Sequence, residues 1–168
     1  MLSGDLFAAF RPLCESQVQF IVVDGVAAVI NAAPIDTFDV DVVYSLEPAN
    51  IDRILAALDT LDAFFRMHQE RRLRPNQSHL AAGGHLNLMT RFGPLDLLGT
   101  IGQDLGYTEL LPQSTEMEIG SGIRVRVLNL ETIIATKEYV ASEKDLAVLP
   151  ILRRTLIEIR QSKGSSKA

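Results

Sequence analysis

The stretch that decides the fold is Thr37-Phe38-Asp39-Val40-Asp41-Val42-Val43-Tyr44, in which acidic and apolar residues alternate. This alternation predicts a β-strand over 38–44. Residues two apart in a strand point to the same face, so Asp39 and Asp41 should present carboxylates side by side, roughly 7 Å apart. The residues expected to face the core on the other side are Phe38, Val40 and Val42.

Two neighbouring carboxylates repel each other, and a cation between them would relieve that repulsion. Oxygen ligands select hard ions, so Mg²⁺ or Mn²⁺ is the expected guest of Asp39 and Asp41. The alternative is an edge strand whose two aspartates only face water, because alternating strands commonly have one solvated face.

A third acid, Asp96, stands alone in Gly93-Pro94-Leu95-Asp96-Leu97-Leu98, an apolar strand that follows a turn signal. A buried carboxylate there needs partners. If this strand lies beside the 38–44 strand, Asp96 completes a three-carboxylate site; otherwise it is a strand residue that faces solvent.

The rest of the chain alternates helical and extended patterns. We expect helices at 4–15, 26–30, 49–65, 130–141 and 143–161, a strand at 20–23, and hairpins at 85–98 and 115–128. We expect a polar, basic loop at 66–79. The order of these elements predicts an α+β fold with a mixed β-sheet flanked by helices and with C-terminal helices at about 130–162.

Bulk composition supports one soluble domain. The chain has 168 residues, 47% of them hydrophobic, and a net charge of −5, which suits a globular core and argues against a protein that coats nucleic acid. We expect a single domain over 1–162 and a disordered tail over 163–168. The single cysteine, the absence of a basic, apolar leader and the absence of a long apolar run predict a cytoplasmic protein that does not enter a membrane.

Taken together, these motifs resemble the DNA polymerase β-type nucleotidyltransferase superfamily. Its pattern is a glycine pair that opens a helix, an Asp-x-Asp strand about a dozen residues later, and a third carboxylate on a later strand. Gly25 matches the helix opening, Thr37 with Asp39 and Asp41 matches the acidic strand, and Asp96 matches the third position. The segments 128–137 and 144–146 resemble the closing helices of the small bacterial branch found in toxin–antitoxin and phage-defence operons.

The resemblance implies transfer of a nucleoside monophosphate from an NTP to a protein or RNA hydroxyl, for example on tRNA. It implies metal ions held by Asp39, Asp41 and Asp96, which would be the catalytic residues, with Asp96 able to assist deprotonation of the acceptor. Gly25, Thr37 and Lys137 are the positions that the resemblance places beside the nucleotide. A solvated helix lysine is the alternative for Lys137.

Two positions depart from the family pattern. Asp24 replaces the first glycine of the pair; it reads as a helix N-cap, and its charge would repel a triphosphate. Ile35 stands where the small branch often has arginine. These departures favour a second hypothesis, a catalytically degenerate nucleotidyltransferase fold that acts as an antitoxin or regulatory partner of an operon-encoded protein. A third is a structural or substrate-binding α+β domain with chance acidic strands.

Two further charged segments have two interpretations each. The basic loop, which contains Arg66, Arg72 and Arg74, either binds a nucleic-acid acceptor or is simply solvated. Lys144 and Asp145 either pair with neighbours or cap the last helix.

Overall fold

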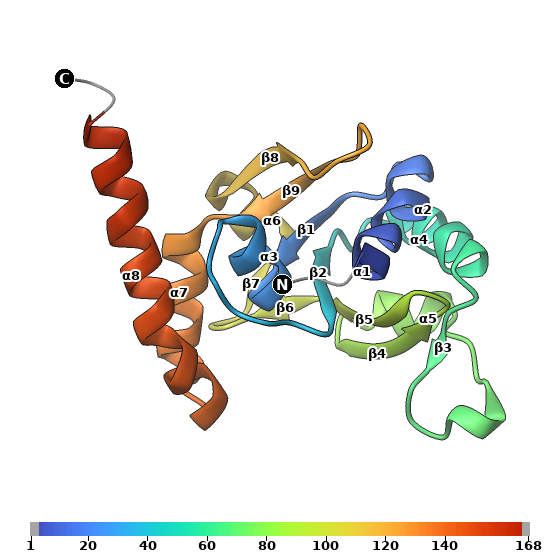
Figure 1. Ribbon diagram of the computed structural model, residues 1–168. Helices are drawn as coiled ribbons and strands as arrows, with labels where there is room; N and C mark the ends of the chain where they lie inside the picture. The colour runs from blue at the N-terminus through green and yellow to red at the C-terminus, as the bar shows by residue number, and fades with distance from the viewer. Residues whose placement is uncertain (1–3, 166–168) are drawn as a thin grey trace.

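A seven-stranded mixed β-sheet forms the centre of the molecule in a computed structural model that describes residues 4–165 (Figure 1). The strand order is β3-β4-β5-β2-β1-β9-β8. The strands are β1 (Phe20–Val23), β2 (Val40–Tyr44), β3 (Phe64–Phe65), β4 (His85–Thr90), β5 (Gly93–Leu98), β8 (Ser114–Glu118) and β9 (Arg124–Leu128). β2 runs antiparallel to β1 and parallel to β5, so the expected mixed α+β fold is confirmed.

Helices cover both faces of this sheet. The α-helices are α1 (Gly4–Ala8), α2 (Phe10–Glu15), α3 (Asp24–Ile30), α4 (Pro48–Thr60), α5 (Gln77–Ala81), α6 (Tyr107–Leu110), α7 (Leu130–Val140) and α8 (Glu143–Ser165). The 3₁₀ helices are η1 (Gln69–Arg71) and η2 (Leu111–Gln113). α5 lies on one face, where the hydroxyl of Tyr44 donates a 2.6 Å hydrogen bond to the Leu80 carbonyl. α7 and α8 stand together at the opposite side of the molecule from α2 and α4 (Figure 1).

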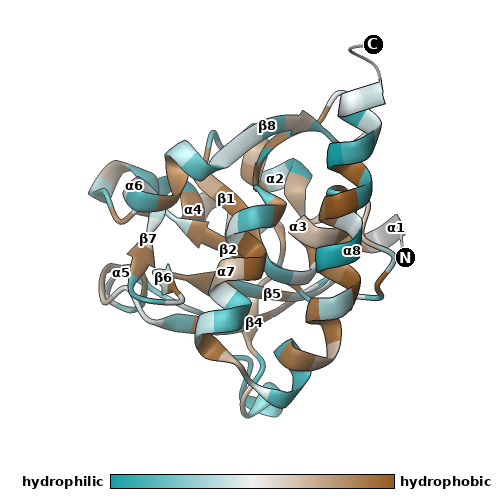
Figure 2. Cartoon of the chain, turned by 90° about the vertical axis from the view of Figure 1, so that its left-hand side faces the viewer, coloured by the Kyte–Doolittle hydropathy of each residue, from teal (hydrophilic) through white to brown (hydrophobic). Residues whose placement is uncertain are grey.

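Alternation along the strands decides which residues form the core. On one face of the sheet Phe20, Val22, Val42, Tyr44, Leu95 and Leu97 are buried. On the other face, the row Val23, Asp41 and Asp96 follows from the strand register. Figure 2 looks onto α7 and α8 and shows apolar and polar residues alternating along α8, whose Leu149 and Leu152 are buried in the core. The strands that carry Asp41 and Asp96 are therefore held in place by buried apolar residues on their opposite face.

The structure corrects several details of the predicted elements. The second strand begins at Val40, and Phe38 lies before it with 78% of its surface exposed, so the prediction that Phe38 faces the core is wrong. The predicted helix at 49–65 ends at Thr60 and is followed by the short β3. A small hairpin of β6 (Thr100–Ile101) and β7 (Leu105–Gly106) was not predicted.

The C-terminal helix is longer than predicted and reaches Ser165, so residues 163–165 of the expected disordered tail are helical. Residues 166–168 lie outside the described part of the chain. Between residues 4 and 165, no helix combines the length and the apolar character needed to span a bilayer.

Candidate functional site

The three predicted aspartates lie on or just before two central strands of the sheet, β2 and β5. Asp41 on β2 and Asp96 on β5 are direct partners in the parallel register. Adjacent strands lie about 4.8 Å apart, so the two side chains stand next to each other on the same face. Asp39 immediately precedes β2 and contributes its charge to the environment of Asp41. The structure thus places all three acids in one neighbourhood.

Asp41 carries most of the electrostatic cost of this arrangement. Burial, the charge of Asp24, a hydrogen bond with the Asp96 carboxyl, and the charges of Asp96 and Asp39 raise the pKa of Asp41 to about 9. Burial disfavours the charged form, and each nearby carboxylate disfavours it further. The surroundings therefore favour the neutral form of Asp41 unless a positive charge joins it.

Asp96 has a partner that the sequence did not reveal. Nη2 of Arg66 lies 2.7 Å from its Oδ1, and both side chains are largely covered. The contact is an ion pair without an aligned N–H, because Oδ1 is buried and accepts no hydrogen bond from the described residues. Asp96 is thus neutralised by an internal guanidinium, while the hydrogen-bonding capacity of that oxygen remains unused.

A cleft of about 270 Å³ opens beside Asp39 and Asp41. Its lining comes from the start of α3, the segment before β2, and the α7–α8 turn: Asp24, Gly25, Ile35, Asp36, Thr37, Phe38, Asp39, Asp41, Lys137, Lys144, Asp145 and Val148. Five of the six predicted site residues line it. The sixth, Asp96, is not part of the lining and touches this group through Asp41.

Position 25, which lines the cleft, has no room for a side chain. A Cβ at this position would lie 2.6 Å from Oγ1 of Thr37 and 3.0 Å from its Cβ. The Thr37 hydroxyl in turn donates a 3.4 Å hydrogen bond to the carbonyl of Asp39. Gly25 and Thr37 therefore hold the start of α3 against the segment that carries the first aspartate.

Asp24 is not the helix N-cap that the sequence suggested. It is the first residue of α3, Val23 precedes it as the N-cap, and no side chain caps the helix. Its φ of 57° lies in the left-handed region that glycine favours. Its carboxylate accepts a 2.7 Å hydrogen bond from Nζ of Lys137.

Lys137 joins three elements through its ammonium group. It is buried, and besides Asp24 it donates a 3.0 Å hydrogen bond to Asp145. Burial alone would lower the pKa of Lys137, but Asp24 and Asp145 outweigh it and raise the pKa above the ordinary value. The alternative of a solvated lysine is therefore wrong.

Asp145 both pairs and caps, so both interpretations of it are confirmed. Besides Lys137 it binds Ser142: the Ser142 hydroxyl donates at 2.7 Å, and the Asp145 N–H returns a 3.1 Å bond to that oxygen at the start of α8. Burial would raise the pKa of Asp145, but Ser142 and Lys137 lower it. This pairing ties α7 and α8 to the β1–α3 junction.

The carboxylates at the cleft could hold a single hard cation, but they do not surround it with protein ligands alone. Within residues 4–165, no three Asp, Glu, His or Cys side chains converge closely enough to enclose a metal ion. Magnesium, however, is usually held by one or two carboxylates together with water and substrate phosphates. Asp39 and Asp41, both open to the cleft, supply that kind of site.

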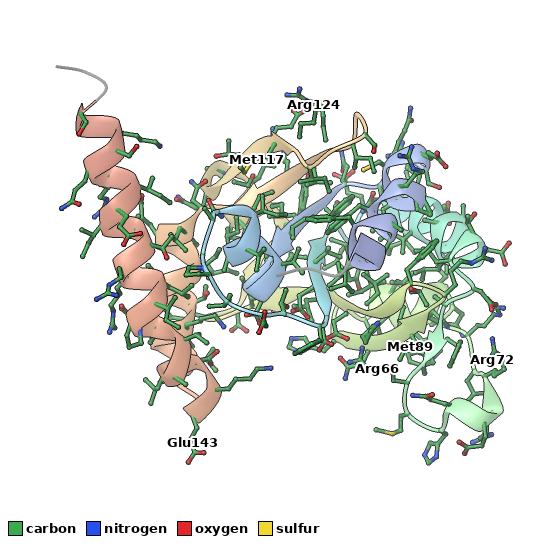
Figure 3. The ribbon with its side chains drawn as sticks, in the orientation of Figure 1. Arg66, Arg72, Met89, Met117, Arg124 and Glu143 are labelled. Atoms are coloured by element: carbon green, nitrogen blue, oxygen red, sulfur yellow. The ribbon has the colours of Figure 1, made fainter. Side chains whose placement is uncertain are left out.

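The basic loop is partly neutralised from within. Nη2 of Arg72 lies 3.0 Å from Asp62, and Arg74 also pairs with Asp62. His79 belongs to a capping box with Asn76 at the start of α5. Arg66, as described above, pairs with Asp96, and Figure 3 shows Arg66 beside β4.

The fold, as distinct from the site, has a counterpart among solved structures. A proposed nucleotidyltransferase from Thermotoga maritima, TM1012, superimposes with a TM-score of 0.52 over 91% of each chain, at 15% sequence identity. At that identity the likeness concerns the fold alone. No protein-family model and no curated protein sequence matches the chain.

Proposed function

We propose that this protein is a metal-dependent nucleotidyltransferase that moves a nucleoside monophosphate from an NTP to a hydroxyl of a protein or RNA acceptor. The observation that carries the proposal is the cleft itself. Its lining combines two carboxylates, Asp39 and Asp41, with two lysines, Lys137 and Lys144, and with Gly25 and Thr37. The nucleotidyltransferase-like fold agrees with it.

Each part of the cleft has a separate task in this proposal. Asp39 and Asp41 would hold Mg²⁺ or Mn²⁺, which when bound neutralises phosphate charge and positions the reacting oxygens. Lys144, exposed at the start of α8 and part of the same lining, would meet the entering phosphates. The exposed ring of Phe38 at the cleft lining offers a face on which a base can stack.

The chemistry balances without further groups. The acceptor hydroxyl attacks the α-phosphorus, a new ester bond forms, and the bond to pyrophosphate breaks. The hydroxyl proton passes to a carboxylate of the acidic group, as expected for general-base assistance. Asp41 is the candidate, because it lines the cleft, whereas Asp96 does not line it and is paired with Arg66.

The test is a transfer assay with each α-labelled NTP, Mg²⁺ or Mn²⁺, and either total tRNA or total protein as acceptor. We expect label on one acceptor class with wild-type protein and none with Asp41→Asn. Asp52→Asn is the matched control, since Asp52 is exposed on α4. No transfer and no calorimetric NTP binding in the presence of metal would refute the proposal.

The second candidate function is a catalytically degenerate nucleotidyltransferase fold that binds a partner, such as an operon-encoded toxin or antitoxin. Asp24 favours it, because a carboxylate occupies the position of the family's first glycine and engages Lys137. This candidate predicts binding of the neighbouring gene product without NTP turnover. Asp24→Gly separates the two: it should restore or raise transfer only if the fold retains the catalytic groups.

A further inference from the structure

Arg66 is built into the sheet rather than attached to its surface. Its backbone N–H donates a 3.0 Å hydrogen bond to the Asn87 carbonyl, and its Nη1 donates a 3.0 Å hydrogen bond to the Leu88 carbonyl. Both acceptors lie on β4, so the side chain crosses that strand to reach Asp96 on β5. Figure 3 shows Arg66 against the β4–β5 hairpin, whereas Arg72 lies out in the excursion after β3.

The guanidinium occupies the approach to the third carboxylate. Nη2 lies 2.7 Å from Oδ1 of Asp96, whose side chain is 12% exposed. A divalent cation on that oxygen would sit about 2.0–2.6 Å away, in the space that Nη2 fills. The two positive groups therefore compete for one oxygen.

The contact between Arg66 and Asp96 differs from an ordinary surface ion pair. Surface pairs contribute little because water screens them and both side chains stay mobile. Here the arginine has two backbone anchors and is 24% exposed. An arginine that is already held loses little further side-chain entropy in keeping this position.

We infer that Arg66 takes the place of a second metal ion, so that the site holds a single divalent cation, on Asp39 and Asp41, with a guanidinium fixed at Asp96. This inference rests on the proposed metal-dependent function. It assigns Arg66 as a positioning residue that keeps Asp96 neutralised and away from the metal. It also distinguishes the site from one in which three carboxylates share two ions.

The inference is tested by counting ions, not by turnover. The full chain is titrated with Mn²⁺, and free Mn²⁺ is followed by its electron paramagnetic resonance signal, with calorimetry as a second readout. We expect one bound ion in wild-type protein and two in Arg66→Gln, in which Asp96 is released beside Asp41. Arg71→Gln is the matched control, because Arg71 is exposed in the same excursion, and it should bind one ion.

Two further variants keep the result interpretable if Arg66→Gln unfolds, which thermal melting would reveal. Arg66→Lys retains the charge and should bind one ion, and Asp96→Asn should also bind one. Two ions in wild-type protein, or a loss of an ion in Asp96→Asn, would overturn the inference while leaving the metal site intact. No bound ion in wild-type protein would instead refute the proposed metal-dependent function, and this inference with it.

Discussion

Replacing Asp41 by asparagine should make the protein more stable, because the folded state holds this carboxyl under strain. Asparagine has nearly the same shape and removes the charge. Asp41 lies among Asp24, Asp39 and Asp96, and its pKa is raised from 3.8 to about 9. An acid with a raised folded-state pKa binds more protons folded than unfolded, so stability falls as the pH rises from 3.8 toward 9.

The raised pKa of Asp41 sets the scale of this gain in stability. At about pH 7.5, the span above 3.8 corresponds to about 5 kcal/mol at roughly 1.4 kcal/mol per pH unit. Water in the cleft beside Asp41 screens these charges and lowers this figure. We take about 3 kcal/mol as the gain, which corresponds to a rise in Tm of roughly 6–12 °C for a chain of this length.

Thermal melting in EDTA at several pH values measures this gain. Asp41→Asn should melt above wild type at pH 7.5, and the difference should shrink to under about 2 kcal/mol near pH 5. Asp52→Asn should show neither effect. Saturating Mn²⁺ should raise the Tm of wild-type protein and leave that of Asp41→Asn nearly unchanged. An equal or lower Tm for Asp41→Asn at pH 7.5 would refute the electrostatic reasoning.

Two other substitutions test the walls of the cleft, both by thermal or urea melting. Lys137→Met removes two charge-assisted hydrogen bonds of a buried ammonium group and should lower the free energy of unfolding by about 2–3 kcal/mol, a figure kept small because Asp24 is about half exposed. Lys144→Met, at an exposed position, should lower it little. Equal losses in the two variants would contradict this reasoning. Gly25→Ala should gain about 1 kcal/mol of stability from helix propensity but lose about 1–3 kcal/mol by overpacking against Thr37. The net loss of stability should be smaller when Thr37→Ala is added. A net gain for Gly25→Ala alone would show that the Thr37 side chain moves aside.

Local pattern was enough to predict most of the sheet. Alternation gave the hairpins around 85–98 and 115–128, and the apolar run at 20–23 gave β1. The pattern around Asp96 left open whether its strand lies beside that of Asp41, and only the family resemblance implied the shared site. Each strand is predictable because its residues are close together in sequence, where the period of two is visible.

The electrostatic partners of the site could not be predicted in the same way. Lys137 meets Asp24 across 113 positions of the chain, and Arg66 reaches Asp96 from a loop with no apolar period. Nothing in a single sequence distinguishes Arg66 from its exposed neighbours in that loop. Phe38 was misplaced because the strand begins two residues later than its alternation suggested.

The net charge of the cleft, to which Asp24 contributes, determines how the proposed NTP substrate could bind. The lining contains five aspartates and two lysines, Lys137 and Lys144, and Lys137 is already engaged by Asp24 and Asp145. With Asp41 protonated, four negative charges still face two positive ones, so a bare triphosphate would be repelled. A triphosphate that arrived as a metal chelate would reverse this balance, because its cation would be attracted by Asp39 and would displace the proton of Asp41. Binding of NTP should therefore require the metal, and binding of metal should strengthen with pH.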